Sequence, residues 1–370
     1  MKNLFFISAL LCFFNSQSQE HSHKSTRALS FPDISGYVTL KTDLHQHTVF
    51  SDGNVWPTIR VQEALRDNLD VISLTEHIEY QPHLADIPHP DRNRSYQIAL
   101  EEAKNHDLML IHGTEITRRA PAGHSNAIFI SDVNSLMQKD SVAQFAAAKS
   151  QGAFVFWNHP AWYAQQPQGN PILSNFQKER IANKELHGIE VINTTDYSEE
   201  ALAIALENDL TIMGTSDIHG LIDWDYIEKG YTRPVTLVFS KERTKASLKE
   251  ALFEGRTVAV FNELIVGKSE YVKPLLKACI KIENATYISN TEILKIELKN
   301  ISSNNILFEN TMDYTFYSSS PVFEIKGGET KTLQVKTLKK LTSLNLQLKA
   351  ISAYDAPKSH PIINWFISLD

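Results

Sequence analysis

The stretch "DLHQHTVFSDG", residues 43–53, places two histidines and two aspartates within eleven residues. It directly follows the alternating segment "YVTLKT", which is typical of a strand. Because successive side chains of a strand point to opposite faces, His45 and His47 share one face, and Asp52 follows in the turn "SDG". Imidazole and carboxylate groups at this spacing indicate a binding site for a divalent metal ion.

Further His, Asp and Glu side chains recur at later strand ends, in "DVISLTEH", "LMLIHGTEI", "AFVFWNHPAW" and "LTIMGTSDIHG", and just before the strand of "GHSNAIFI". In an α/β barrel, the loops that follow the strands form one active-site face. The residues that share this context are His45, His47, Asp52, His77, Glu115, His124, His159, Asp217 and His219. A single His or Asp usually has a structural role, and His106, His112 and His187 are interpreted in that way. The shared context of the nine predicts a metal centre.

This donor set contains nitrogen and oxygen atoms and no thiolate, so it suits two or three divalent ions of Mn, Fe or Zn rather than Ca or a soft ion. Neighbouring ions of this kind favour attack on phosphorus. They polarise a phosphoryl oxygen, lower the pKa of a bound water and align the nucleophile with the leaving group. The residues therefore predict a hydrolase that acts on a phosphate ester.

Strand-like and helix-like segments alternate from residue 37 to residue 262, which predicts parallel strands with crossover helices. Helices are expected over 58–68, 96–107, 142–152, 199–209 and 243–255. From about residue 270 the pattern changes to short strands without a helix, typical of a small antiparallel β-sandwich. The expected organisation is a linker at 20–36, a hydrolase domain at 37–265 and a β-sandwich domain at 270–370. No ligand cluster lies in the sandwich, so the chemistry is expected in the first domain.

The 43 acidic residues outnumber the 36 Lys and Arg, and the net charge is −7, which disfavours a nucleic-acid partner.

Residues 1–19 have the pattern of a secretory signal peptide, so a secreted, periplasmic protein is expected. No other apolar run is long enough to cross a membrane. After cleavage Cys279 is the one remaining cysteine, and it is expected to be a small buried hydrophobe. The sequence carries no signal of oligomeric state.

The segments "DLHQHTVFSDG", "LTEH", "GTEIT", "GHSN", "NHP" and "GTSDIHG", in this order, resemble the PHP family, named for its polymerase and histidinol phosphatase members. The resemblance covers roughly residues 40–220. It implies a distorted, TIM-like (β/α)7 barrel and a phosphoesterase with two or three metals. Carried over by position, it implies one metal on His45, His47, Glu115 and Asp217, a second on Glu115, His124 and His159, and a third on Asp52, His77 and His219. Glu76 departs from the family, since many members have Asp before that His.

The long polar segment "EYQPHLADIPHPDRNRSY", residues 79–96, together with the C-terminal β domain, is similar to exported members that are phosphodiesterases acting on small organophosphates. This narrower resemblance implies cleavage of diesters through a metal-bridging hydroxide, with Glu115, Asp217 and His219 as catalytic residues. The expected substrate-binding residues are Arg92, Arg94, Arg118 and His83, although an exposed, salt-bridging role is an equal alternative for each Arg. Alternative functions are a phosphomonoesterase, an amidohydrolase-type hydrolase and a non-catalytic metal-binding module. The amidohydrolase alternative is disfavoured because "SDIH" supplies Asp and His together and Glu115 replaces a bridging Lys.

Overall fold

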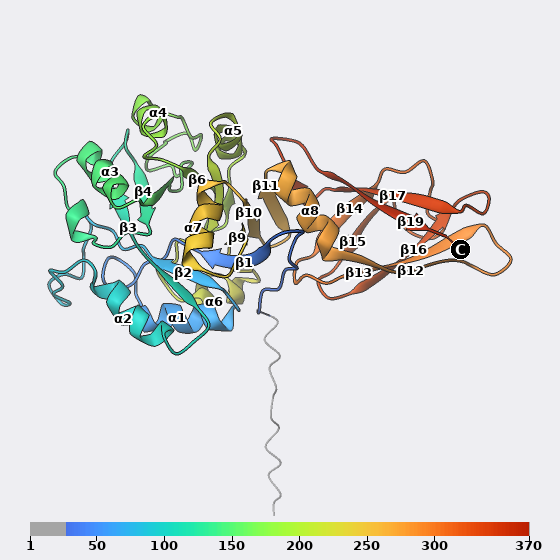
Figure 1. Ribbon diagram of the computed structural model, residues 1–370, viewed down its shortest axis with the longest axis horizontal. Coiled ribbons are helices and arrows are strands. Elements are labelled where there is room, and N and C mark those ends of the chain that lie inside the picture. Colours follow the sequence, from blue (N-terminus) through green and yellow to red (C-terminus); the bar gives the residue numbers. More distant parts are fainter. Residues whose placement is uncertain (1–26, 370) are drawn as a thin grey trace, which may run out of the picture.

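The structure, a computed structural model, describes residues 27–369. Figure 1 shows a barrel-like domain with helices on its outside and, beside it, an elongated domain built mainly of strands. The signal peptide predicted at 1–19 and the linker residues 20–26 lie outside the described residues. The chain from Arg27 onward packs on the barrel, where Leu29 and Ile34 are buried.

A curled, mixed sheet forms the first domain. Seven strands follow one another around it: β1 (Val38–Asp43), β2 (Val71–Leu74), β3 (Met109–Thr117), β4 (His124–Ile128), β5 (Phe154–Trp157), β6 (Gly188–Asn193) and β8 (Thr211–Thr215). At the end of β8 the sheet returns to β1, because Gln46 and Ile218 form a parallel bridge. The amide of His47 donates to the carbonyl of Ile218 (3.0 Å), and the amide of Asp217 donates to the carbonyl of His45 (3.0 Å). The distorted, barrel-like α/β fold is thereby confirmed.

The expectation of parallel strands throughout was wrong in part. Strand β4 runs antiparallel to both β3 and β5. Only residues 118–123 connect β3 to β4, and a parallel pair needs a crossover of about a dozen residues. On the other side of β1, the strands β9 (Val235–Ser240), β10 (Thr257–Phe261) and β11 (Leu264–Gly267) are antiparallel neighbours as well.

Five helices lie within a few residues of the expected ranges: α1 (Pro57–Arg66), α2 (Arg94–Ala103), α3 (Ser141–Ser150), α5 (Glu199–Glu207) and α7 (Lys245–Phe253). Helix α1 begins with Pro57, whose missing amide hydrogen costs nothing there. Side chains of Asp140, Ser198 and Thr244 accept hydrogen bonds at the starts of α3, α5 and α7. The short elements α4 (Asn175–Ala182), α6 (Ile222–Asp225), η1 (Asn134–Leu136) and η2 (Ile227–Lys229) were not expected.

The second domain is a sandwich of two antiparallel sheets, as expected. One sheet contains β12 (Ile280–Tyr287), β13 (Ile293–Asn300) and β16 (Thr330–Lys336); the other contains β15 (Val322–Ile325), β14 (Ile306–Asn310), β17 (Ser343–Ala350) and β19 (Ile362–Ser368). Strand β13 alternates strictly, with Leu294, Ile296 and Leu298 fully buried. This alternation supplies the apolar face that each sheet packs against the other.

The expectation of no helix from about residue 270 onward was wrong, because α8 (Ser269–Cys279) leads into the sandwich. Its buried residues Val272, Leu275, Leu276 and Cys279 have helical spacing, but Pro274 within the segment argues against a helix. One hydrophobic cluster runs from the barrel through α8 into the sandwich, so the helix acts as a packed connector. Cys279 is free and buried within this cluster.

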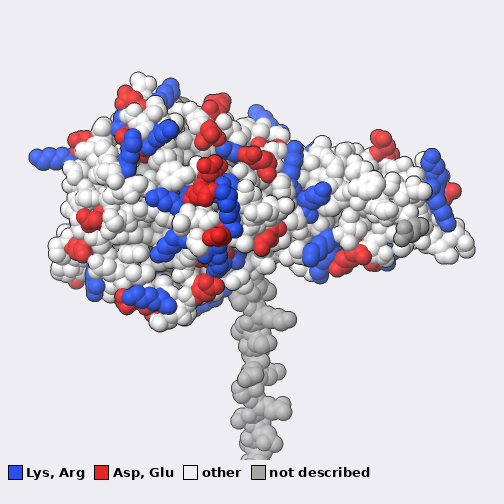
Figure 2. Space-filling view, in the orientation of Figure 1, with Lys and Arg blue, Asp and Glu red and all other residues white. Residues whose placement is uncertain are grey.

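The two domains also share a strand pair, since β18 (Ala353–Tyr354) runs parallel to β11. The small strand β7 (Asp196–Tyr197) turns back antiparallel to β6. On the face shown in Figure 2, acidic and basic side chains are interspersed. Within residues 27–369, no helix has the length and apolar composition needed to cross a membrane.

Candidate metal centre and active site

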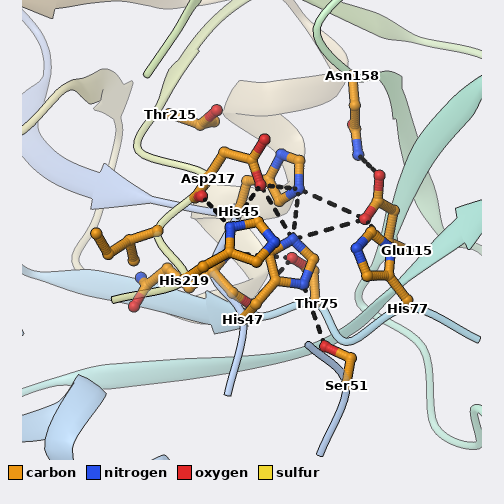
Figure 3. Close-up of polar contacts among 12 residues, drawn as sticks. His45, His47, Ser51, Thr75, His77, Glu115, Asn158, Thr215, Asp217 and His219 are labelled. Atoms are coloured by element: carbon orange, nitrogen blue, oxygen red, sulfur yellow. Dashed lines mark hydrogen bonds and ion pairs between the residues drawn. The ribbon is translucent and has the colours of Figure 1, made fainter. Parts of the chain in front are cut away.

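All nine predicted ligands come together at the end of the barrel where β1 and β8 meet. Figure 3 labels six of them: His45, His47, His77, Glu115, Asp217 and His219. Several of their donor atoms lie within 4.8 Å of one another and form three overlapping groups: His45, His47 and Asp217; His77, Glu115 and His124; and His47, Asp52, His77 and His219. His159 joins this cluster through its ring, which lies close to both Glu115 and Asp217. The residues thus form one continuous centre.

In the first group His45 and His47 are fully buried, whereas Asp217 is partly exposed to the cavity. The Nε2 atoms of His45 and His47 lie 3.1 Å apart, and Oδ1 of Asp217 is 3.1 Å from each. Oε2 of Glu115 lies 3.7 and 3.6 Å from the same two nitrogens. Donor atoms bound to one tetrahedral ion at roughly 2.1 Å are separated by about 3.4 Å. The four donors predicted for the first metal therefore have the spacing of a coordination shell.

Glu115 connects the first group to the second. Its Oε1 lies 2.8 Å from Nδ1 of His124 and 3.6 Å from Nε2 of His159, while its Oε2 lies 2.6 Å from Nδ1 of His77. Nε2 of His159 is also 4.0 Å from Oδ2 of Asp217. The predicted second group of Glu115, His124 and His159 is present, with His77 as an additional neighbour. Glu115 has the position of a bridging carboxylate.

Asp52 is the centre of the third group. Its Oδ1 lies 3.2 Å from Nε2 of His219, 3.4 Å from Nε2 of His77 and 3.9 Å from Nδ1 of His47. This Oδ1 is buried and accepts no hydrogen bond from any described residue. A buried carboxylate oxygen without a donor is costly unless a cation is present. The donor set and this unpaired oxygen both fit a divalent ion.

Burial and neighbouring charges separate the pKa values within the centre. Burial, together with the nearby His77 and His219, lowers the pKa of His47 to about 3, so this ring is neutral near pH 7. Burial opposes protonation of His77, but the carboxylates of Glu115 and Asp52 raise its pKa to about 10. Burial likewise opposes ionisation of Glu115, yet His77 and His124 hold its pKa well below its usual range. Opposite charges so close together keep the carboxylates ionised, as metal binding requires.

Glu190 on β6 is a site residue that the sequence interpretation missed. Its Oε1 accepts hydrogen bonds from Nδ1 of His45 (2.7 Å) and from the hydroxyl of Thr215 (2.6 Å). Its Oε2 accepts from the amide of His159 (2.6 Å). A carboxylate behind a ligating imidazole sets its tautomer and orientation. The signal was a charged residue inside the apolar strand "GIEVIN".

Glu76, the departure from the family pattern, holds the loop that carries Asp52. It is buried and accepts hydrogen bonds from the amide of Thr48 (3.0 Å), the hydroxyl of Thr48 (2.5 Å) and the hydroxyl of Ser51 (2.6 Å). Ser51 in turn lies 3.3 Å from Nδ1 of His47. Glu76 therefore holds the loop that connects the ligands His47 and Asp52.

Asp43 belongs to a buried ion-pair network behind the centre. It pairs with Nε of Arg233 (2.7 Å) and accepts from the hydroxyl of Ser216 (2.6 Å), the residue before Asp217.

The backbones of Asp217 (φ 50°) and His159 (φ 29°) are in the left-handed region, which is strained for residues other than Gly. Such strain at two ligand positions indicates that the surrounding contacts hold them there.

Beside the ligands lies a cavity of about 440 Å³. It is lined by Asp52, His77, His124, His159, Pro160, Ala161, Trp162, Tyr163, Glu190, Val191, Asn193, Thr194, Asp196, Ser198, Asp217 and His219. None of these described lining residues is Lys or Arg. The cavity is therefore lined by ligands of the metal centre and by residues of the segments 160–163 and 190–198.

The four predicted substrate-binding residues Arg92, Arg94, Arg118 and His83 are not among the residues that line this cavity. Arg118 is held by an ion pair with Glu79 (2.9 Å) and a hydrogen bond to Gln144 (2.7 Å). No residue of 79–96 lines the cavity either, although Tyr80 lies edge-on to the ligand His77, with ring centroids 6.1 Å apart. This loop is tied to another segment, because Asn134 accepts from the amide of Arg92 (3.0 Å) and Asp132 accepts from the side chain of Asn93 (2.9 Å).

Similarity to known proteins was found for both domains. Residues 280–366 match the family DUF5001, described as an Ig-like domain. The chain is 40% identical, with a TM-score of 0.85, to the crystal structure of a two-domain protein from Bacteroides vulgatus that contains a predicted PHP-like metal-dependent phosphoesterase. The match covers 92% of this chain and 98% of that one.

More distant similarity covers smaller parts of the chain. PsfC from Pseudomonas syringae is 18% identical with a TM-score of 0.41, over 60% of this chain and 92% of its own. An amidohydrolase from Chromobacterium violaceum is 14% identical with a TM-score of 0.35, over 48% and 87%. No curated protein matches the chain.

Proposed function

This chain belongs to the family of PHP-like metal-dependent phosphoesterases, and from that premise we propose that it hydrolyses small organic phosphodiesters. The observation that supports a diester is the charge of the cavity. No Lys or Arg is found among its described lining residues, whereas carboxylates and imidazoles are frequent. A monoester dianion carries one more negative charge than a diester, and a fixed cation is the usual partner for that charge. A singly charged diester needs no such partner.

The ligands fit divalent ions of Mn, Fe or Zn in two or three positions. His45, His47, Glu115 and Asp217 would hold one ion; Glu115, His124 and His159 a second; and Asp52, His77 and His219 a third. When bound, such ions polarise the phosphoryl oxygen and lower the pKa of water.

His219 is placed to handle a proton at the leaving group. Its Nδ1 lies 2.8 Å from the backbone carbonyl of Asp217 and donates to it, while Nε2 faces Oδ1 of Asp52 at 3.2 Å. The side chain is 36% exposed and lines the cavity. Burial opposes its protonation, but Asp52 and Asp217 raise the pKa of His219. A protonated imidazole at the cavity can act as a general acid when the third ion is absent.

A paired substrate panel tests the proposal. Methyl p-nitrophenyl phosphate and p-nitrophenyl phosphate share a leaving group and differ in the second ester. We expect a higher kcat/KM for the diester, with the Glu115→Ala variant as the control for contaminating enzymes. A preference for the monoester of tenfold or more, about 1.4 kcal/mol of transition-state discrimination, would make the protein a phosphomonoesterase.

We also propose that the enzyme is exported to the periplasm. The proposal is supported by the signal-peptide pattern at residues 1–19, which lie outside the described part of the chain. N-terminal sequencing of the protein from fractionated cells tests it. A mature protein that starts near residue 19 or 20 in the periplasmic fraction is expected, and an uncleaved protein in the cytoplasm would contradict it.

A further inference from the structure

We propose that Trp162 and Tyr163 form a subsite for one organic substituent of the phosphodiester, and that this substituent is aromatic and carries no negative charge. The inference deepens the proposed function and rests on it. Both side chains line the cavity, and neither is a metal ligand. They follow His159 in the segment "NHPAWY", so the same turn that presents a ligand also presents the two rings.

Trp162 lies directly beside the second ligand group. Its ring centroid is 5.2 Å from that of His159 and 5.6 Å from that of His124, with interplanar angles of 78° and 65°. These edge-to-face contacts fix the indole next to the place where the phosphoryl group must lie. A substituent on that phosphorus would therefore lie beside the indole.

The backbone holds Trp162 in place before any substrate arrives. Its amide donates to the carbonyl of His159 (2.9 Å), and its carbonyl accepts from the amides of Gln165 and Gln166 (2.9 Å each). The ring is nevertheless 41% exposed, and Tyr163, at a centroid distance of 6.4 Å, is 75% exposed. Two large, exposed and ordered aromatic rings at the edge of a catalytic cavity offer stacking area to a ligand.

The charge of the cavity restricts which substituent fits. Besides the ligands, the charged lining residues are Glu190 and Asp196, both acidic, and the described wall contains no Lys or Arg. Asn193, Thr194 and Ser198 add uncharged polar groups to the lining. A substituent with its own carboxylate or phosphate would be repelled, whereas a neutral aryl or heteroaryl group gains stacking contacts.

Unreactive phosphinates separate binding from turnover. Diphenylphosphinate and dimethylphosphinate are monoanions like a phosphodiester, but their P–C bonds are not hydrolysed. Their Kd values for the metal-loaded protein would be measured by calorimetry, with bis(4-carboxyphenyl)phosphinate as the anionic probe. Trp162→Ala is expected to raise the Kd for diphenylphosphinate by at least about fivefold. This corresponds to about 1 kcal/mol of binding free energy, the scale of one aromatic contact. The Kd for dimethylphosphinate should change less than twofold. The carboxylated probe should bind the wild-type protein more weakly than diphenylphosphinate does.

Two variants serve as controls. Trp162→Phe keeps an aromatic ring and should retain most of the affinity for diphenylphosphinate. Trp224→Ala removes an exposed Trp (61%) on α6 that does not line the cavity, and should change nothing. Metal content by elemental analysis must be the same in all variants, which shows that the centre is intact.

The outcomes distinguish the two proposals. If Trp162→Ala lost the same affinity for both phosphinates, or lost none, the subsite proposal would be overturned while the proposal of diester hydrolysis would stand. If the carboxylated probe bound wild type more tightly than diphenylphosphinate, the charge argument would be overturned. If the metal-loaded wild type neither cleaves diesters nor binds any phosphinate, the proposed function fails and the subsite with it.

Discussion

Tyr354 of the Ig-like domain stacks on Tyr197 of the barrel, with ring centroids 5.5 Å apart and an interplanar angle of 27°. Tyr197 lies between Asp196 and Ser198, which both line the cavity. Nearby, the amide of Lys358 donates to Oε1 of Glu199 (2.7 Å). The C-terminal domain therefore contributes no residue to the three ligand groups, but it supports the back of the cavity wall.

We expect Tyr354→Ala to raise KM for an aryl diester by roughly twofold to tenfold, because an aromatic pair contributes about 0.5–1.5 kcal/mol. Metal content and kcat should change little, since the wall and not the centre is disturbed. Steady-state kinetics with elemental analysis measures both. Tyr354→Phe keeps the stack and is the matched control, and Tyr317→Ala controls for loss of an exposed Tyr in the same domain. An unchanged KM would show that the contact has no role in substrate binding.

The purified protein should carry at least two transition-metal ions per chain, because its donor atoms form three groups within 4.8 Å. Chelator should remove the diesterase activity, and Mn, Fe or Zn should restore it. Elemental analysis before and after dialysis gives the stoichiometry. Activity that survives a metal-free preparation would refute this prediction.

Glu115→Ala should be among the most damaging single changes. Its two oxygens approach His124 and His77, and one of them also approaches both residues of the His-x-His pair. Loss of the carboxylate should reduce metal content and lower kcat/KM by several orders of magnitude. Glu309→Ala, on the Ig-like domain, is a control for a lost surface charge. Near wild-type turnover with full metal content would place the bridge on another residue.

Glu190→Gln should weaken metal binding by about 10- to 100-fold, the usual effect of losing a carboxylate behind a ligating imidazole. The amide is isosteric, so the barrel should keep its fold, which circular dichroism can verify. Metal affinity, titrated with a competing chelator, is the direct measurement. The prediction fails if the affinity of the variant stays within twofold of wild type.

The buried His112 should account for part of the loss of folding stability in acid. Burial lowers its pKa to about 4 in the folded protein, against 6.5 for an ordinary His. The unfolded chain thus binds the proton first as the pH falls, and stability decreases between about pH 6.5 and 4, by up to about 3 kcal/mol. His112→Phe can keep the stack on Tyr96 (4.1 Å, 15°) and should show a shallower decrease. Urea unfolding at several pH values tests this, and an equal slope in both proteins would contradict it.

The His-x-His spacing at residues 45 and 47, the apolar period of α1 and the alternation in β13 were all legible in the sequence. Each is a local pattern, in which side-chain direction follows from the 2.0 or 3.6 residue repeat. The order of the ligand segments also predicted that they meet, because strand ends of one barrel share a face. Helix α8 was missed because Pro274 hides an otherwise helical pattern.

The tertiary structure alone decided what surrounds the ligands. Glu190 reaches His45 across 145 residues, and Tyr354 reaches Tyr197 from the other domain. Residues 79–96 have the length of a pocket wall, yet none of them lines the cavity, and Arg92 and Asn93 are hydrogen-bonded to Asn134 and Asp132 instead. Periodicity shows which face a side chain takes on its own element. It contains no information on which distant element that face will meet, because that depends on packing of the whole chain.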